Sequence, residues 1–575
     1  MQTVRRLYLY GMSGVTLAVL LTGLNNLFVV VFHAVGLGRG AALAGDTSGD
    51  RDQLSLAIAL TVVGLLVWTV HWLLVERSLR PENPASAAER GSPIRALYLS
   101  LVLAVLLVFG VLAGVQLLEH LARLLFGISP SSDFEFIQID VGAALATVLV
   151  TGLAWLYHAT IRRRDLAAAA MSGGGAWIPR VYLYGATLLG LVMTAINLGT
   201  LLRMASDALA GPAPGFIGGD VVRRGAADAL AGMLGWGIVY GGHWWYATSL
   251  LRGEGWRASS ERQSRLRVAY YVAAIGAAAI ATVVFGWQSL SSVLGLMLGA
   301  ERDFVSESAL GSAVGPLLGL LPWIVAWFVH ARWMADEARA SEVPDRAAAV
   351  GRLAAAAVGL VGIGAFAGGA AGLMGLLLDI LLGGNRTDAG LWRHELADFL
   401  AVGLVGAALW LWNWASLQRH WAADPEGEAR STARRAYLLV IVGVALLASL
   451  ASLAVLLYRL LNAILGVDQF TNVASTVSAA LGALLTAGAL AAYHGLAERR
   501  DRALREATPA AEPGQVSPVP AATAPGPPAS APSVGAATAE RTFVLRAPSA
   551  EALEAAVNAV RAGLPSGTEL EERPS

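Results

Sequence analysis

The pentapeptide WTVHW, residues 68–72, closes a long apolar run and organises the whole chain, because variants of it return five times. They are WLYH at 155–158, YGGHWW at 240–245, WFVHARW at 327–333, WLWNW at 410–414 and AAYH at 491–494. The corresponding positions are His71, His158, His243, His330, Asn413 and His494, spaced 81 to 87 residues apart. Such nearly even spacing indicates an internal repeat.

The composition places these repeats in a membrane. Of 575 residues, 56% are hydrophobic and 14% are charged, whereas an ordinary soluble domain carries about 25% charged residues. Apolar runs of 20 to 30 residues recur, long enough for an α-helix to cross a bilayer. We therefore expect an all-α integral membrane protein. The chain has no cysteine, which excludes disulfides, thiolate metal sites and cysteine nucleophiles.

Two further landmarks accompany the motif. Arginine followed closely by tyrosine starts an apolar run at RRLYLY (5–10), IRALY (94–98), PRVYLY (179–184), RLRVAYY (265–271) and RRAY (434–437), while the fifth copy keeps only Arg352. A glycine follows 29 residues after the tyrosine at Gly127, Gly211, Gly299 and Gly466. Each repeat is then a helix of about 29 residues, a polar connector and a helix of about 23 residues.

We expect six parallel two-helix repeats and about twelve transmembrane helices in all. The repeats cover residues 1–80, 81–170, 171–257, 258–342, 343–426 and 427–505. Residues 506–540 contain eight prolines and predict a disordered linker. Residues 541–575 form a short tail, with a candidate strand at 542–547 and a candidate helix at 549–562, where a protein partner could bind.

The arginines orient the helices. Of 41 basic residues, 27 lie near the start of a first helix or the end of a second helix, and 10 lie in the connectors within the repeats. By the positive-inside rule, both termini are expected in the cytoplasm. Gly364, Gly368 and Gly372, spaced at four, are expected to let two helices approach closely.

The R-x-x-Y-x-Y start of the first helix and the W-x-x-H-W end of the second resemble a bacterial membrane family known only as domain of unknown function 5671. The resemblance covers about residues 4–500 in tandem copies. It implies an integral membrane protein, here of the inner membrane, and brings no reaction, ligand or catalytic residue with it. The sequence departs from the family pattern at Asn413 and at the tyrosine missing near residue 354.

The repeated motif has three interpretations. The first is an aromatic belt at the membrane interface, with a tyrosine–histidine hydrogen bond inside each repeat. The second is a set of ionisable groups facing a shared pathway that relays protons. The third is metal or haem ligation by histidines of neighbouring repeats. We favour the first. The candidate residues are Trp68, His71, Trp155, His158, His243, Trp327, His330, Asn413 and His494, with Tyr8, Tyr98, Tyr182, Tyr270 and Tyr437.

The sequence favours a non-enzymatic membrane scaffold or sensory component, without cofactor, whose partner is the lipid bilayer and not a nucleic acid. The alternative is a transporter or channel whose pathway is lined by the repeated His, Trp and Tyr positions. That alternative predicts helices broken near Gly368 and Gly369, or near Pro316 and Pro322. A haem- or metal-binding membrane protein is the third possibility. No catalytic motif was found.

Overall fold

The computed structural model describes residues 2–37, 47–83, 85–128, 140–168, 173–210, 219–252, 256–300, 309–341, 345–382, 391–466 and 470–507. The chain divides into two units, Met1–Pro509 and Ala510–Ser575, and all described residues belong to the first. The predicted linker after residue 507 and the predicted tail strand and helix lie outside the described residues.

Every regular element in the described ranges is an α-helix, as the sequence predicts. Twelve of these helices are long: α1 (Gln2–Ala34), α2 (Thr47–Ser78), α4 (Pro93–Leu125), α5 (Val141–Ala168), α6 (Gly173–Ala210), α7 (Gly219–Ser249), α9 (Arg265–Met297), α10 (Ala309–Arg339), α11 (Arg346–Leu381), α12 (Leu391–Ala423), α14 (Thr432–Ile464) and α15 (Phe470–Ala507). Three are short: α3 (Ser86–Arg90), α8 (Trp256–Arg262) and α13 (Pro425–Arg430).

Eleven helices of the described part are long and apolar enough to cross a membrane. The long helix outside this set is α7, which carries Arg223, Arg224 and Asp228 in its first half. The second helices of the predicted repeats run to between 28 and 38 residues, longer than the 23 expected. The estimate was short because it counted only the apolar run, whereas the helices continue into their arginine-rich ends.

The landmark glycines end helices. Gly127, Gly299 and Gly466 follow α4, α9 and α14 with φ of 66°, 63° and 69°. Glycine adopts this left-handed conformation without steric cost, and it lets the backbone turn back on the last helical carbonyls. The amide of Ile128 accordingly donates to the carbonyl of Arg123 at 3.0 Å.

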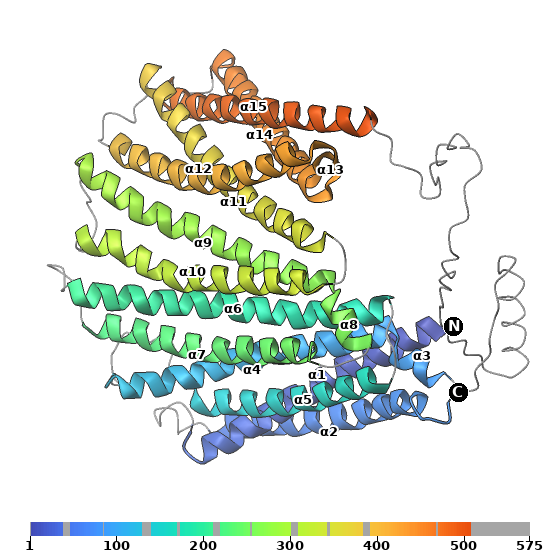
Figure 1. Cartoon of the computed structure of the whole chain (residues 1–575). Helices are drawn as coiled ribbons and strands as arrows, with labels where there is room; N and C mark the ends of the chain where they lie inside the picture. The colour runs from blue at the N-terminus through green and yellow to red at the C-terminus, as the bar shows by residue number, and fades with distance from the viewer. Residues whose placement is uncertain are drawn as a thin grey trace, which may run out of the picture. The chain divides into compact units, whose positions relative to one another are not determined.

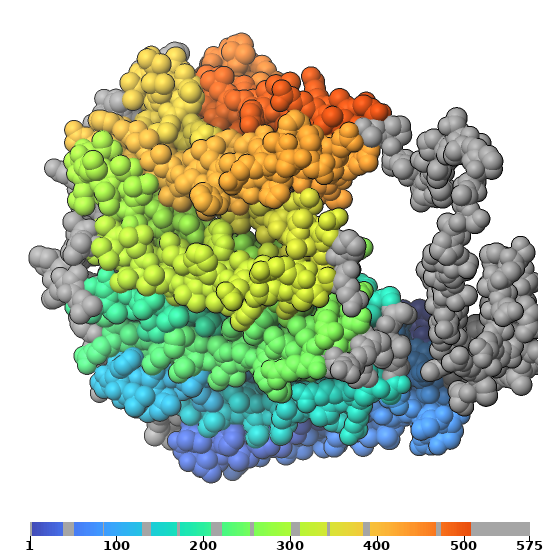
Figure 2. Space-filling view, in the orientation of Figure 1, coloured from blue at the N-terminus to red at the C-terminus, as the bar shows by residue number. Residues whose placement is uncertain are grey.

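The long helices pack in antiparallel pairs that follow chain order: α1 with α2, α4 with α5, α6 with α7, α9 with α10, α11 with α12, and α14 with α15 (Figure 1). The first helix of each pair also packs on the second helix of the next pair, as α1 does on α5 and α4 on α7. Within the described helices, this offset arranges the pairs in a row. The space-filling view shows them as successive bands of colour (Figure 2).

The short helices group the pairs further. α3, α8 and α13 each join the first pair to the second within a group of four long helices. No helix is described between α5 and α6 or between α10 and α11. We therefore distinguish three four-helix units: α1–α5, α6–α10 and α11–α15.

Of the three glycines expected at close helix contacts, only Gly372 lies at one, because a Cβ there would lie 2.2 Å from the Phe399 ring. A Cβ on Gly364 or Gly368 would meet nothing within 4 Å, so neither lies at a close approach. The backbones of the two helices also approach closely at Gly369 and Gly403, where a Cβ on Gly369 would lie 2.5 Å from the Gly403 backbone. The expectation for Gly364 and Gly368 was wrong because spacing alone does not show which helix face meets the neighbour.

The predicted helix breaks are absent from the described residues. α10 runs without interruption through Pro316 and Pro322, and α11 through Gly368 and Gly369. Proline and glycine are tolerated inside such helices where neighbouring helices support the backbone.

Candidate functional site

Each short helix contributes a buried glutamate. Glu89, Glu261 and Glu428 are 9%, 3% and 1% exposed. Each stands three residues before a serine and six before an arginine in the first turn of the next long helix, so that E-x-x-S-x-x-R-x-x-Y recurs at 89–98, 261–270 and 428–437. The Ser264 and Ser431 side chains cap their helices by accepting the backbone N–H of that arginine. The motif therefore places a carboxylate and a guanidinium at fixed positions around a helix start.

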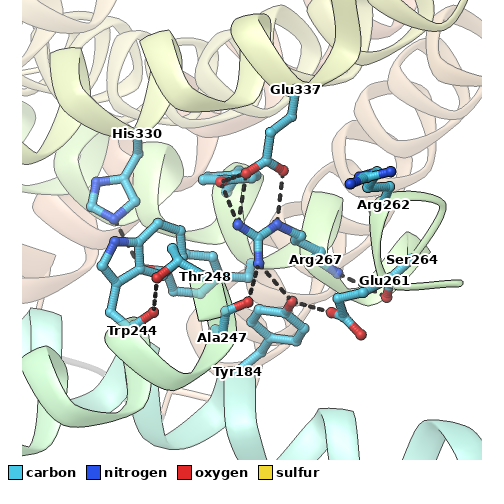
Figure 3. A network of polar contacts seen from close by, with 12 residues as sticks. Tyr184, Trp244, Ala247, Thr248, Glu261, Arg262, Ser264, Arg267, His330 and Glu337 are labelled. Atoms are coloured by element: carbon cyan, nitrogen blue, oxygen red, sulfur yellow. Dashed lines mark hydrogen bonds and ion pairs between the residues drawn. The ribbon is translucent and has the colours of Figure 1, made fainter. Parts of the chain in front are cut away.

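The second arginine centre, defined as Arg180, Tyr184, Glu261, Arg267 and Glu337, shows the arrangement most fully. Figure 3 shows Tyr184, Glu261 and Glu337 around Arg267. Arg180 Nε donates to Glu261 Oε2 at 2.8 Å. The Tyr184 hydroxyl donates to the other oxygen of Glu261 and accepts from Arg267 Nη1 at 3.1 Å. A chain of charged and polar groups thus runs from α6 through α8 to α9.

Arg267 is the hub of this centre. Its Nε and Nη2 donate to the two oxygens of Glu337 at 2.7 and 2.6 Å, which is the bidentate geometry of a strong ion pair. Nη1 also donates to the carbonyl of Ala247 at 3.1 Å, and Nη2 to the hydroxyl of Tyr271 at 3.3 Å. A guanidinium has five N–H donors. All five have protein partners here, and the residue is 1% exposed.

The first arginine centre, defined as Arg6, Tyr10, Glu89, Arg95 and Asp165, repeats the pattern. Arg6 Nε donates to Glu89 at 2.7 Å, and the Tyr10 hydroxyl donates to the same carboxylate at 2.9 Å. Arg95 donates to Tyr10 at 3.2 Å and to Asp165 at 2.6 Å. The carboxylate at the end of α5 therefore has the role that Glu337 has at the end of α10.

The third arginine centre, defined as Arg352, Glu428, Arg434 and Asp501, lacks the tyrosine. The position four residues after Arg352 is Ala356. Arg352 pairs with Glu428, and Arg434 Nε donates to Asp501 at 2.7 Å. Glu428 Oε2 and Arg434 Nη1 are buried without a hydrogen-bond partner among the described residues. These are the two kinds of atom that the tyrosine hydroxyl joins in the other centres.

A tryptophan lies against the buried arginine of every centre. The guanidinium carbons of Arg95, Arg267 and Arg434 lie 5.9, 5.2 and 5.5 Å from the ring centroids of Trp72, Trp244 and Trp414, respectively. A cation over an aromatic face is stabilised by the ring quadrupole. Each tryptophan directly follows the His or Asn of the repeated motif, which links the two sets of residues.

The structure brings together the tyrosine and histidine predicted for each of four pairs. Tyr8 lies 3.4 Å from His71, Tyr98 3.5 Å from His158, Tyr182 3.1 Å from His243, and Tyr270 2.8 Å from His330, measured from the hydroxyl to Nε2. The fifth and sixth pairs differ. Asn413 replaces the histidine, and no hydrogen bond joins Tyr437 to His494, although their rings lie 6.2 Å apart.

Backbone contacts determine how these histidines can act. Nδ1 of His71, His158, His243, His330 and His494 lies 2.7 to 3.0 Å from the carbonyl four residues earlier. A carbonyl only accepts, so Nδ1 carries the proton and Nε2 of the neutral ring is the acceptor. In the four bonded pairs the tyrosine hydroxyl already donates to Nε2. That lone pair is therefore engaged and not free to bind a metal.

The histidines also differ in burial. His158, His330 and His494, on the second helix pair of each unit, are 1%, 1% and 0% exposed. His71 and His243, on the first pairs, are partly exposed. The three fully buried rings lie between packed helices, and this is not the position that an interfacial aromatic belt requires. Within the described part of the chain, no group of three or more His, Asp or Glu side chains has the arrangement of a metal site.

The predicted tryptophans line the same region with other partners. The indole N–H of Trp155 donates to the Tyr182 hydroxyl of the next pair at 3.0 Å. Trp327 packs in a cluster of buried residues that contains Tyr270 and Tyr271. Trp68 stacks on Trp72, with ring centroids 6.0 Å apart, and its indole N–H is unpaired among the described atoms.

Sequence reasoning did not find the carboxylates of the three centres or the bridging tyrosines Tyr10 and Tyr184. The signal was present as the recurring E-x-x-S-x-x-R-x-x-Y segment, which has a period of about 170 residues. A search at the shorter period of about 85 residues obscured it, because the glutamate occurs only between the two pairs of one unit.

The fold and the arginine centres define a multi-pass helical membrane protein built from three four-helix units. The family described as domain of unknown function (DUF5671) matches residues 6–153, 180–325 and 352–489, so one copy of the family domain coincides with most of one unit. The chain belongs to this family. No curated protein and no solved structure matches it.

Proposed function

We propose that this protein is a non-enzymatic scaffold of the inner membrane, with twelve membrane-crossing helices in six parallel hairpins and both termini in the cytoplasm. In this proposal the three arginine centres lie at the cytoplasmic ends of the helices and hold successive hairpins together. The tail beyond residue 507 would then extend into the cytoplasm, where it is available to a protein partner.

The full engagement of Arg267 carries the proposal. A catalytic or transport site needs a polar group that is free to contact a substrate, whereas all five donors of Arg267 are already bound to protein groups. The partners come from four elements, α6, α7, α9 and α10, so the guanidinium links two helix pairs of one unit. Breaking a buried ion pair costs about 3–5 kcal/mol; here the Arg267 side chain is buried and the Glu337 side chain is 32% exposed, and the five hydrogen bonds together make the guanidinium a structural joint.

The histidine geometry supports the same proposal over its rivals. Four of the repeated imidazoles accept a tyrosine hydroxyl within their own hairpin, so each contact joins two antiparallel helices. Proton relay along the membrane normal would need polar groups that follow one another at increasing depth. The tyrosine–histidine contacts instead lie near one level, a few residues before the arginine-rich helix ends.

The absence of cysteine from the chain makes the orientation directly testable. Glu82→Cys lies on the arginine-rich side and Val35→Cys on the other, and both positions are exposed. In intact cells a membrane-impermeant maleimide should label Val35→Cys alone, and it should label Glu82→Cys only after the membrane is opened. The reverse pattern would overturn the proposed topology.

The scaffold role is tested by proton and ion flux in proteoliposomes, together with the visible spectrum and metal content of the purified protein. We expect flux equal to that of protein-free liposomes and a colourless, metal-free sample. Flux that disappears in His330→Asn would replace the scaffold with a transport function. A Soret band or stoichiometric metal that disappears in His494→Asn would replace it with a cofactor-binding function, because Nε2 of His494 has no hydrogen-bond partner among the described residues.

A further inference from the structure

A groove runs along the side of the molecule between the α4–α5 pair and the α6–α7 pair, at the boundary of the first and second units. Its volume is about 520 Å³, within the range of about 300–1,000 Å³ that is usual for small-molecule sites. Ile238 and Trp245 on its rim are 72% and 60% exposed, so the groove opens sideways and is not enclosed. In a membrane protein this side faces lipid.

The wall of the groove is apolar over most of its length. Along α4 it extends from Leu103 to Leu118, a distance of about 22 Å at 1.5 Å per residue. Glycines at 110, 114, 235 and 242 contribute to it, and a Cβ on Gly242 would meet no atom within 4 Å. Tyr182 and His243 also contribute, but they are hydrogen-bonded to each other. Such a wall suits a hydrocarbon chain.

Two arginines form the other part of the lining. Arg162 Nη2 donates to the carbonyl of Pro179 at 2.9 Å, and its guanidinium carbon lies 5.3 Å from the ring centroid of Tyr182. Arg163 lies 5.8 Å from the ring centroid of Tyr246. Within the described ranges neither has a carboxylate partner, in contrast to every arginine of the three arginine centres. Among the described residues, no acidic side chain lines the groove.

The next unit boundary lacks this pair of cations. At the positions 172 residues further along, α10 has Met334 in place of Arg162 and Ala335 in place of Arg163, and Ala354 replaces Tyr182. Met334 is buried in a cluster of apolar residues. The two arginines that lack carboxylate partners among the described residues therefore distinguish the boundary between the first and second units from the boundary between the second and third.

We propose that this groove binds one anionic phospholipid, with its phosphate at Arg162 and Arg163 and one acyl chain along α4 and α7. The charge complementarity selects the occupant, because an apolar chain alone would leave both cations without an anion. Juxtamembrane arginines attract anionic headgroups in this way. The proposal goes beyond the scaffold function and requires only that these helices lie in a bilayer.

Native mass spectrometry of the full-length protein in neutral detergent tests this, with equimolar phosphatidylglycerol and phosphatidylcholine of identical acyl chains as the probes. Two matched pairs of variants are compared. Gly242→Leu and Gly241→Leu both add a side chain where a Cβ meets no atom within 4 Å, but only residue 242 lines the groove. Leucine is also the better helix former, so neither variant should impair folding. Arg163→Gln and Arg164→Gln each remove one charge, and only residue 163 lines the groove.

We expect the unmodified protein to retain one phosphatidylglycerol in preference to phosphatidylcholine. Arg163→Gln should lower that retention about fivefold, the effect of roughly one headgroup contact, and Gly242→Leu should abolish it. Gly241→Leu and Arg164→Gln should retain the lipid as the unmodified protein does. Equal retention of the two lipids, or equal retention by all variants, would overturn the proposal. The proposal would also be overturned if the bound species were an uncharged small molecule or a second copy of the chain, and if Gly242→Leu alone lost that species.

Discussion

In the second arginine centre the hydroxyl of Tyr184 lies between Glu261 and Arg267, whereas in the third centre the equivalent residue is Ala356. The charged partners are otherwise the same in kind, a glutamate from the short helix and a carboxylate near the end of the last helix. In the third centre one carboxylate oxygen and one guanidinium nitrogen are left without partners among the described residues. One hydroxyl therefore separates a fully hydrogen-bonded centre from an incomplete one.

The second and third units also differ at the tyrosine that stands three residues after the buried arginine. The Tyr270 hydroxyl lies 2.8 Å from His330, whereas the Tyr437 hydroxyl and Nε2 of His494 are both buried without a hydrogen-bond partner in the described part of the chain. The preceding hairpin of the third unit also has Asn413 where the second unit has His243. The polar contacts of the third unit are thus weaker at several points. Because an unpaired buried polar group costs about 1–3 kcal/mol, we expect this unit to be the least stable of the three.

The largest expected effect is that of Arg267→Ala. This substitution leaves Glu337 without its cation and the Tyr184 hydroxyl without its donor, whereas Glu261 keeps its ion pair with Arg180. We expect it to lower the free energy of unfolding by about 3–5 kcal/mol. Chemical denaturation in mixed micelles, followed by tryptophan fluorescence, measures the change.

Arg434→Ala is the matched comparison. It should lower the free energy by about 3 kcal/mol, the lower end of that range. Asp501 is buried, but it keeps the indole N–H of Trp421 as a donor at 3.0 Å, and Arg434 Nη1 lacks a partner among the described residues. Equal losses in the two variants would show that the completeness of the hydrogen bonding does not distinguish the centres.

A smaller effect is expected from Tyr184→Phe, which gives the second centre the deficiency of the third. Removing the hydroxyl leaves Arg267 Nη1 with one partner fewer and one oxygen of Glu261 without its donor, at a cost of about 1–3 kcal/mol. Tyr8→Phe is the control, because Tyr8 is 57% exposed and its hydroxyl makes a long hydrogen bond of 3.4 Å to His71. Unfolding midpoints that fall equally for both variants would contradict the bridging role of Tyr184.

The smallest effect concerns the buried histidines. Asparagine can keep the contact to the carbonyl four residues earlier, as Asn413 does with Leu409 at 2.8 Å. His330→Asn should therefore lose mainly the hydrogen bond to Tyr270, about 0.5–1.5 kcal/mol. In His494→Asn there is no such bond to lose. The difference between the two stabilities is the quantity to measure, and a difference of zero would mean that the Tyr270–His330 contact contributes nothing.

The sequence predicted some parts of the candidate site and missed others for physical reasons. Tyr98 and His158, or Tyr270 and His330, were paired correctly, because helices joined by a short connector bring the start of one beside the end of the next. The pairing of Arg95 with Asp165, 70 residues apart, was not predicted, because both arginines and acids are abundant near the helix ends. Spacing along one helix cannot select among several possible partners on another.

The sequence by itself determined the helical class, the order of the helices, and the glycines that end several of them. These features follow from local physics, since apolar runs favour burial in a bilayer and glycine adopts the left-handed turn freely. Only the tertiary structure decided which glycines allow close approach, which carboxylate each arginine meets, and that the natural unit has four long helices. Those outcomes depend on how helices rotate and pack against each other, so residues distant in the chain decide them together.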